Sequence, residues 1–219
     1  MKKSDSQLQQ DVLQELKYEP SVSASEIGVT VKEGIVGLTG NVQSYAEKYA
    51  AAHAAERVAG VKAVTDELKV DLPAFHVRND EDIARAVVDA LKWNVWVPAD
   101  RIKVKVDHGW VTLEGEVDHK YEQTAAEDAV RNLTGLTGVS NFIIVTRPAV
   151  SASEVKKTIE QALNRAAEID ADKIDVTVEK DKVILNGKVG SWAERDEAER
   201  AAWSAPGVNE VVDYLDVAA

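Results

Sequence analysis

A short motif, Leu-x-Gly-x-Val, recurs three times at nearly constant spacing, at residues 38–42, 113–117 and 185–189. Its central glycines are 115 − 40 = 75 and 187 − 115 = 72 residues apart. The same two offsets, applied without a gap, align further apolar residues and a second set of glycines: Ile27, Ile102 and Ile174; Val29, Val104 and Val176; Leu16, Leu91 and Leu163; Gly60, Gly135 and Gly207. Self-similarity at a fixed period is the signature of tandem structural repeats. The sequence therefore predicts three copies of one module.

Proline-containing segments near residues 73–79 and 148–151 separate the copies. They place domain 1 at residues 1–73, domain 2 at 74–148 and domain 3 at 149–219. Both connecting segments are short, so we expect neighbouring modules to touch. A module of about 70 residues holds only a modest core, and contacts between modules are expected to add stability.

Within each copy, the apolar pattern changes its period. Leu8, Val12 and Leu16 recur at helical spacing, and the residues after them alternate apolar and polar on both sides of a short turn, which predicts a β-hairpin. Ser44 and Glu47 have capping-box spacing at the start of a second, alanine-rich helix. A last strand closes the copy. The predicted fold class is α+β: three tandem αββαβ modules, each a three-stranded mixed sheet packed by two helices.

The hairpin turns differ among the copies. They are Glu33-Gly34, His108-Gly109 and Lys180-Asp181. Two-residue hairpin turns require positive φ, which glycine adopts without strain. The third copy is therefore expected to have the least favourable turn.

The composition indicates which classes of partner are unfavourable and which cellular compartments we expect. Basic residues number 26 and acidic residues 38, for a formal net charge of −12, which disfavours nucleic-acid binding. The absence of cysteine excludes disulfides and thiolate–metal sites. No apolar run approaches the ~18 residues of a transmembrane helix, and no apolar stretch follows Lys2-Lys3 as in a signal peptide. We expect a cytoplasmic protein, or a periplasmic one if the sequence is a mature exported form.

A glycine-led signature closes each copy, at residues 60–68, 135–143 and 207–215: Gly-[Val/Leu]-x-x-Val-x-[Asn/Asp]-x-[Leu/Ile]. With the preceding helix, hairpin and helix, it resembles the BON domain, a module of osmotically inducible and transport-associated bacterial proteins. The resemblance implies a non-catalytic module linked to osmotic stress, to phospholipid surfaces of the bacterial envelope and, in some members, to potassium. It marks the glycines as structural positions: Gly40, Gly115, Gly187, Gly60, Gly135 and Gly207.

No set of residues suggests catalysis or metal binding. The four histidines lack the His-x-x-x-His and His-Glu-x-x-His spacings of zinc sites. The acidic residues Glu168, Asp170, Asp172 and Asp175 lack the glycine and the terminal glutamate of a calcium loop, so we interpret them as solvated. We expect no enzyme activity, no catalytic residue, no metal and no cofactor.

Several aromatic residues occupy positions that are polar in a sister copy. Trp96 aligns with Ser21 and Glu168, Trp203 with Glu56 and Arg131, while Trp110 aligns with Lys182 and Phe142 with Glu67. Core positions do not tolerate such exchanges, so we expect these aromatics on module surfaces. Two interpretations stay open: packing between modules, or a site for a partner or membrane. The candidate binding residues are Trp93, Trp96, Val97, Trp110, Phe142 and Trp203.

The sequence thus favours a multivalent, stress- or envelope-related binding protein that contacts phospholipid or a protein partner. The alternatives are a cytoplasmic potassium-binding or potassium-sensing protein, and an interaction scaffold. The oligomeric state stays open.

Overall fold

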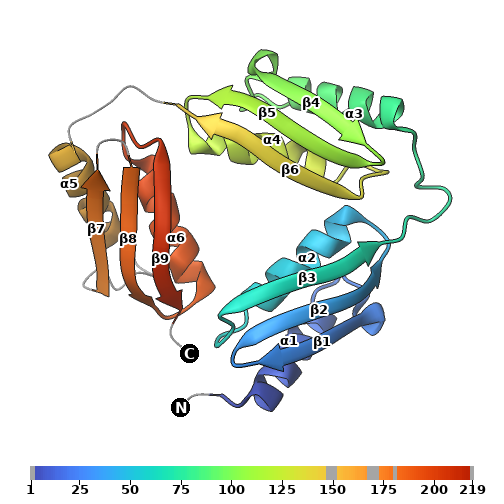
Figure 1. Ribbon diagram of the computed structural model, residues 1–219, viewed down its shortest axis with the longest axis horizontal. Coiled ribbons are helices and arrows are strands. Elements are labelled where there is room, and N and C mark those ends of the chain that lie inside the picture. The colour runs from blue at the N-terminus through green and yellow to red at the C-terminus, as the bar shows by residue number, and fades with distance from the viewer. Residues whose placement is uncertain (1–2, 147–151, 167–172, 180–181, 218–219) are drawn as a thin grey trace.

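Three copies of one α-β-β-α-β module make up the computed structural model of the chain (Figure 1), which describes residues 3–146, 152–166, 173–179 and 182–217. The predicted repeat and fold class are confirmed. Module 1 contains α1 (Asp5–Tyr18), β1 (Ile27–Lys32), β2 (Ile35–Val42), α2 (Tyr45–Glu56) and β3 (Ala63–Val70). Module 2 contains α3 (Asp80–Trp93), β4 (Ile102–Asp107), β5 (Trp110–Val117), α4 (Lys120–Arg131) and β6 (Gly138–Val145). Module 3 contains α5 (Ala152–Arg165), β7 (Ile174–Glu179), β8 (Lys182–Val189), α6 (Trp192–Ser204) and β9 (Glu210–Val217).

Each module folds around a mixed sheet whose middle strand is the second one. In module 1, β2 pairs antiparallel with β1 and parallel with β3, and modules 2 and 3 repeat this order. Parallel neighbours require a crossover connection, which the second helix of each module supplies. Both helices pack on one face of the sheet, so the other face is open. In Figure 1 the strands of all three modules lie in front of their helices.

Every module has its own core. The helical stripe Leu8, Val12 and Leu16 is buried against the inward residues of β1 and β2. The second helix of module 1 contributes Ala51, Ala54 and Ala55, all fully buried. Their small side chains let this helix lie close to the sheet.

The motif glycines are required by a close approach of two backbone segments. Gly40, Gly115 and Gly187 have φ of 124°, 156° and 142°, in the region that favours glycine. A Cβ at any of them would overlap the carbonyl oxygen of the residue that precedes the first strand of the module: Glu26, Arg101 or Lys173. The glycine therefore allows the hairpin strands to pair up to the edge of the sheet.

An aspartate at the start of the first helix holds the hairpin turn in modules 1 and 2. The turn residues Glu33 and Gly34 have positive φ, as predicted, and their N–H groups donate to the Asp5 carboxylate at 2.8 and 3.2 Å. In module 2, Asp80 accepts from the N–H groups of the turn residues at 2.9 Å each. The predicted third turn, Lys180-Asp181, lies outside the described residues.

Candidate functional site

The last residue of α3 and the loop after it form an exposed apolar segment in module 2. Trp93 and Val95 are each 89% exposed and Trp96 is 62% exposed. The loop is fixed from inside, because Asn94 Oδ1 accepts from the Trp96 N–H at 3.0 Å and Asn94 Nδ2 donates to the Ala125 carbonyl at 3.4 Å. We call Trp93, Val95 and Trp96 the aromatic loop. Its conformation is therefore held by the module while its apolar side chains face solvent.

The predicted site residues Val97 and Trp96 connect this loop to the rest of module 2. Val97, predicted as a binding residue, is 9% exposed and packs in the core of module 2; it anchors the loop and offers little surface. The Trp96 ring meets Tyr121 edge-on at 5.7 Å between centroids, and Tyr121 stacks on His119 at 5.2 Å. The start of α4 thus extends the aromatic surface.

Trp110 and Phe142 lie on the open face of the module 2 sheet, away from the aromatic loop. The Trp110 ring lies over Gly138, where any Cβ would overlap it, and its Nε1–H donates to Ser140 Oγ at 2.9 Å. Phe142 and Ile144 on β6 are 65% and 60% exposed. At the position of the Trp110–Gly138 pair, module 3 has an ion pair.

That ion pair joins Lys182 and Glu210 at 2.8 Å, and module 1 has Ile35 beside Ala63 at the same place. The exposed face of the sheet is therefore specific to each module, although the fold beneath it is the same.

Trp203 lies between modules 2 and 3. It is half-buried and packs against the cores of both modules, and the Lys120 ammonium lies 4.9 Å from its ring centroid. Its Nε1–H donates to Glu199 Oε1 at 3.0 Å. In the structure this aromatic residue packs between modules, one of the two interpretations left open by the sequence.

Two further aromatic contacts between modules were not predicted from the sequence. The Arg131 guanidinium of module 2 stacks 3.6 Å from the Tyr49 ring centroid of module 1. The Trp192 Nε1–H of module 3 donates to the Val61 carbonyl of module 1 at 2.7 Å. Trp192 aligns with Tyr45 and Lys120 under the repeat offsets, and comparing these positions would have singled it out.

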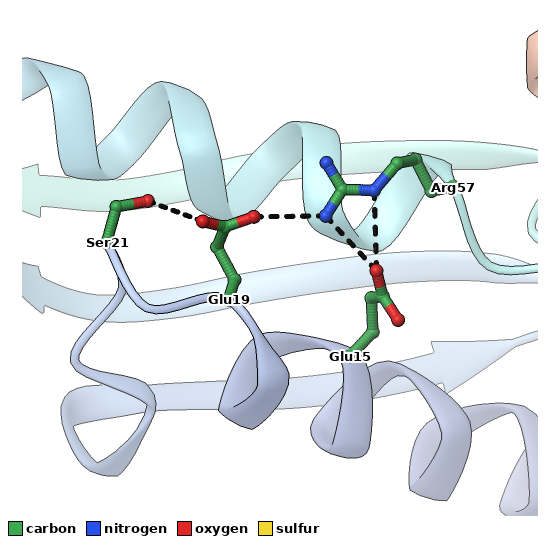
Figure 2. A network of polar contacts seen from close by, with 4 residues as sticks. All are labelled: Glu15, Glu19, Ser21 and Arg57. Atoms are coloured by element: carbon green, nitrogen blue, oxygen red, sulfur yellow. Dashed lines mark hydrogen bonds and ion pairs between the residues drawn. The ribbon is translucent and has the colours of Figure 1, made fainter.

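A groove of about 600 Å³ lies between module 1 and the end of α4. It is lined by Glu19, Ser21, Ser44, Ala46, Glu47, Tyr49, Ala50, His53, Arg57, Arg131 and Asn132. Figure 2 shows the charged network at its edge: Arg57 Nη2 binds Glu15 Oε1 and Glu19 Oε2 at 3.1 Å each, and Ser21 Oγ donates to Glu19 at 2.8 Å.

The charges in this network compensate one another. The hydrogen bond from Ser21 and then the bonds from Arg57 hold the pKa of Glu19 below its ordinary value. Hydrogen bonds to Glu19 and Glu15 raise the pKa of Arg57. Both effects favour the ionised forms, so the network joins the end of α1 to the end of α2.

No three histidine, aspartate or glutamate side chains gather in a way that could hold a metal ion within the described part of the chain. Glu168, Asp170 and Asp172, interpreted above as solvated, lie outside it. Among the described helices, none is long and apolar enough to cross a membrane.

The structure thus defines a class of protein built from tandem αββαβ modules. The sequence matches the BON domain at residues 4–71, 79–147 and 151–219. The chain therefore belongs to the BON-domain family, with three tandem copies, as its resemblance predicted. BON domains are non-catalytic binding modules.

Osmotically-inducible protein Y of Escherichia coli (strain K12) is 29% identical over 125 residues, which cover 55% of this chain and 62% of that protein. The match thus spans less than two thirds of the relative's length.

Among solved structures, CdsD, a structural protein of the Type III secretion system of Chlamydia trachomatis, is 16% identical with a TM-score of 0.28, covering 97% of this chain and 92% of that one. Its C-terminal domain is 15% identical with a TM-score of 0.28 and 96% coverage of both chains. TM-scores this low support no inference.

Proposed function

We propose that this chain is a non-catalytic binding protein that attaches to phospholipid surfaces through the aromatic loop of module 2. The observation that supports this proposal is the exposure of Trp93, Val95 and Trp96. The loop that carries them is held in place by Asn94 and Val97. Tryptophan is favoured at the boundary between headgroups and acyl chains, because its ring is apolar and its N–H is polar. A rigid loop of this kind enters that boundary with little loss of conformational entropy.

Charge decides which force drives the attachment. The chain has a net charge of −12, so long-range attraction to anionic lipid is absent. Insertion of apolar side chains must then dominate. Because screening affects charge–charge interactions and not apolar burial, attachment is expected to persist, or to strengthen, as salt is raised.

The test is vesicle flotation with phosphatidylglycerol and with phosphatidylcholine, each at low and moderate salt. The chain should float with vesicles, and Trp93→Ala/Trp96→Ala should lose at least about tenfold in binding, since each exposed tryptophan contributes roughly 1–2 kcal/mol on partial burial. Tyr18→Ala is the matched control, because Tyr18 is 83% exposed and occupies in module 1 the position of Trp93.

Equal binding by the double variant would reject the role of the aromatic loop. Failure of the unsubstituted chain to float with either lipid would reject phospholipid attachment altogether. Melting in potassium and in sodium at equal ionic strength would then test the potassium-binding alternative, since a bound ion raises the melting temperature. The oligomeric state, measured by sedimentation at high protein concentration, would test the alternative of an interaction scaffold.

A further inference from the structure

The groove between module 1 and the end of α4 has the size of a small-molecule site. Its volume of about 600 Å³ lies within the range of ligand pockets. Two modules form its wall, because α2 supplies one side and Arg131 and Asn132 at the end of α4 supply the other. Ala46, Ala50 and the Tyr49 ring give the groove an apolar part. None of these residues belongs to the aromatic loop, so the groove is a separate candidate site.

The two carboxylates in the lining of the groove already have donors. Glu47 is buried, and its two carboxylate oxygens accept from the backbone N–H groups of Ser23 and Gln43 at 2.7 and 2.8 Å. Both oxygens of Glu19 are also bonded, at 2.8 and 3.1 Å, as Figure 2 shows. Since these buried and half-buried acceptors are satisfied, a ligand that only donates hydrogen bonds finds no free carboxylate in the lining.

The two arginines in the lining, by contrast, have N–H groups without an acceptor. Arg57 uses Nε and Nη2 for two carboxylates, and Figure 2 shows its other terminal nitrogen, Nη1, unbonded to the residues drawn. Arg131 uses Nη2 for Asp128, while its buried Nε has no partner within the described part of the chain. The two side chains are 53% and 20% exposed, so both can be reached from solvent. A charged acceptor would complete their hydrogen bonding.

We propose that this groove binds a small organic acid, whose carboxylate accepts hydrogen bonds from the arginines of the lining and whose apolar body covers Tyr49, Ala46 and Ala50. An inorganic oxyanion would leave the apolar part of the groove uncovered. The charged residues of the lining are two arginines and two glutamates, in a chain with a net charge of −12. A single negative charge therefore meets less repulsion here than over the acidic surface elsewhere.

A ligand held in this groove contacts two modules at once. Arg57 is the C-cap of α2 in module 1. Arg131 ends α4 in module 2, where its guanidinium lies 3.6 Å from the ring centroid of Tyr49 in module 1. Because both modules supply the site, the ligand binds the folded chain and not the unfolded one. It therefore raises the melting temperature of the chain.

Titration of the full chain with benzoate, followed by nuclear magnetic resonance, tests the proposal. Benzamide has the same ring without the charge and is the matched control ligand. We expect saturable shifts at roughly millimolar benzoate, centred on the amide groups of residues 19–21, 44–57 and 131–132 that line the groove. Benzamide should cause no saturable shift. Inorganic phosphate should bind more weakly than benzoate, because it has no apolar body.

Two substitutions change the groove in different ways. Arg131→Gln removes one cation and should weaken benzoate binding at least about tenfold. Arg85→Gln is its control, because Arg85 is 62% exposed on α3 and pairs there with Glu81. Ala46→Leu keeps both cations and fills the apolar part of the groove, so it should lose benzoate binding as well. Circular dichroism confirms that each variant is folded.

Four results would overturn the proposal. They are the absence of saturable shifts with benzoate, equal binding of benzamide, tighter binding of phosphate than of benzoate, and benzoate binding that survives either Arg131→Gln or Ala46→Leu in a folded variant.

Discussion

At the scale of single residues, the three copies keep the residues that the backbone conformation requires and differ in the residues exposed on the sheet. Gly40, Gly115 and Gly187 hold one positive-φ conformation in all three modules, and a Cβ at any of them would overlap the backbone carbonyl of the residue before the first strand. By contrast, the pair Trp110–Gly138 becomes Lys182–Glu210 in module 3. The glycines recur because any side chain at these positions would overlap the backbone. An exposed pair, by contrast, can be exchanged without loss of the fold.

This contrast predicts that Gly187→Ala destabilises module 3 by about 2–4 kcal/mol, through strain at positive φ and overlap with the Lys173 carbonyl. Gly190→Ala is the control in the same module, since its Cβ would meet only the end of the flexible Glu194 side chain at 3.2 Å. Urea denaturation compares the two variants. Equal unfolding midpoints would show that the motif glycine is not needed for its conformation.

At the scale of elements, one side chain connects the first helix to the hairpin. Asp80 begins α3 and accepts both N–H groups of the turn between β4 and β5. Asp5 does the same in module 1, and Ala152 occupies this position in module 3. Ser4 and Asp5 are adjacent at the start of α1, and either side chain is of a type that can cap a helix. The structure assigns the cap to Ser4, whose side chain accepts from the Gln7 N–H, and leaves Asp5 for the turn.

Asp80→Ala should therefore lower the melting temperature of module 2 near neutral pH. Hydrogen bonds from Gly109, then from His108, lower the pKa of Asp80, so the ionised carboxylate stabilises the folded state. This contribution is present above the ordinary pKa of aspartate and is lost as the pH falls through the lowered pKa. The difference between variant and unsubstituted chain should shrink toward acid pH.

The control for this substitution is Glu81→Ala, because Glu81 is 84% exposed and pairs only with Arg85 in the part of the chain that the structure describes. A difference between Asp80→Ala and the unsubstituted chain that stays constant from neutral to strongly acid pH would contradict the assigned role of the carboxylate.

At the scale of the whole molecule, two kinds of tryptophan have different roles. Trp203 packs against the cores of modules 2 and 3, whereas Trp93 is 89% exposed. Trp203→Ala should lower the free energy of unfolding by about 2 kcal/mol, roughly half of what a fully buried tryptophan contributes. Trp93→Ala should leave it unchanged. Urea denaturation measures both, and equal effects would show that Trp203 does not join the modules.

The sequence alone predicted the repeat, the order of elements, the mixed sheets, the helical stripes and the turn glycines. These features depend on local periodicity and on backbone sterics. Both can be read within one copy of the repeat and checked against the other two copies. The domain boundaries at residues 73–74 and 148–149 stay a prediction. The exposure of Trp96, Trp110 and Phe142 followed from the same comparison, because exposed positions tolerate polar residues in sister copies.

Only the tertiary structure decided how these residues are grouped. It separated the aromatic loop from the open sheet face, buried Val97 in the core and placed Trp203 and Trp192 at joints between modules. Periodicity within a module specifies which face is buried, but it carries no information about the contact between one module and another. That contact depends on shape and charge across surfaces far apart in the chain.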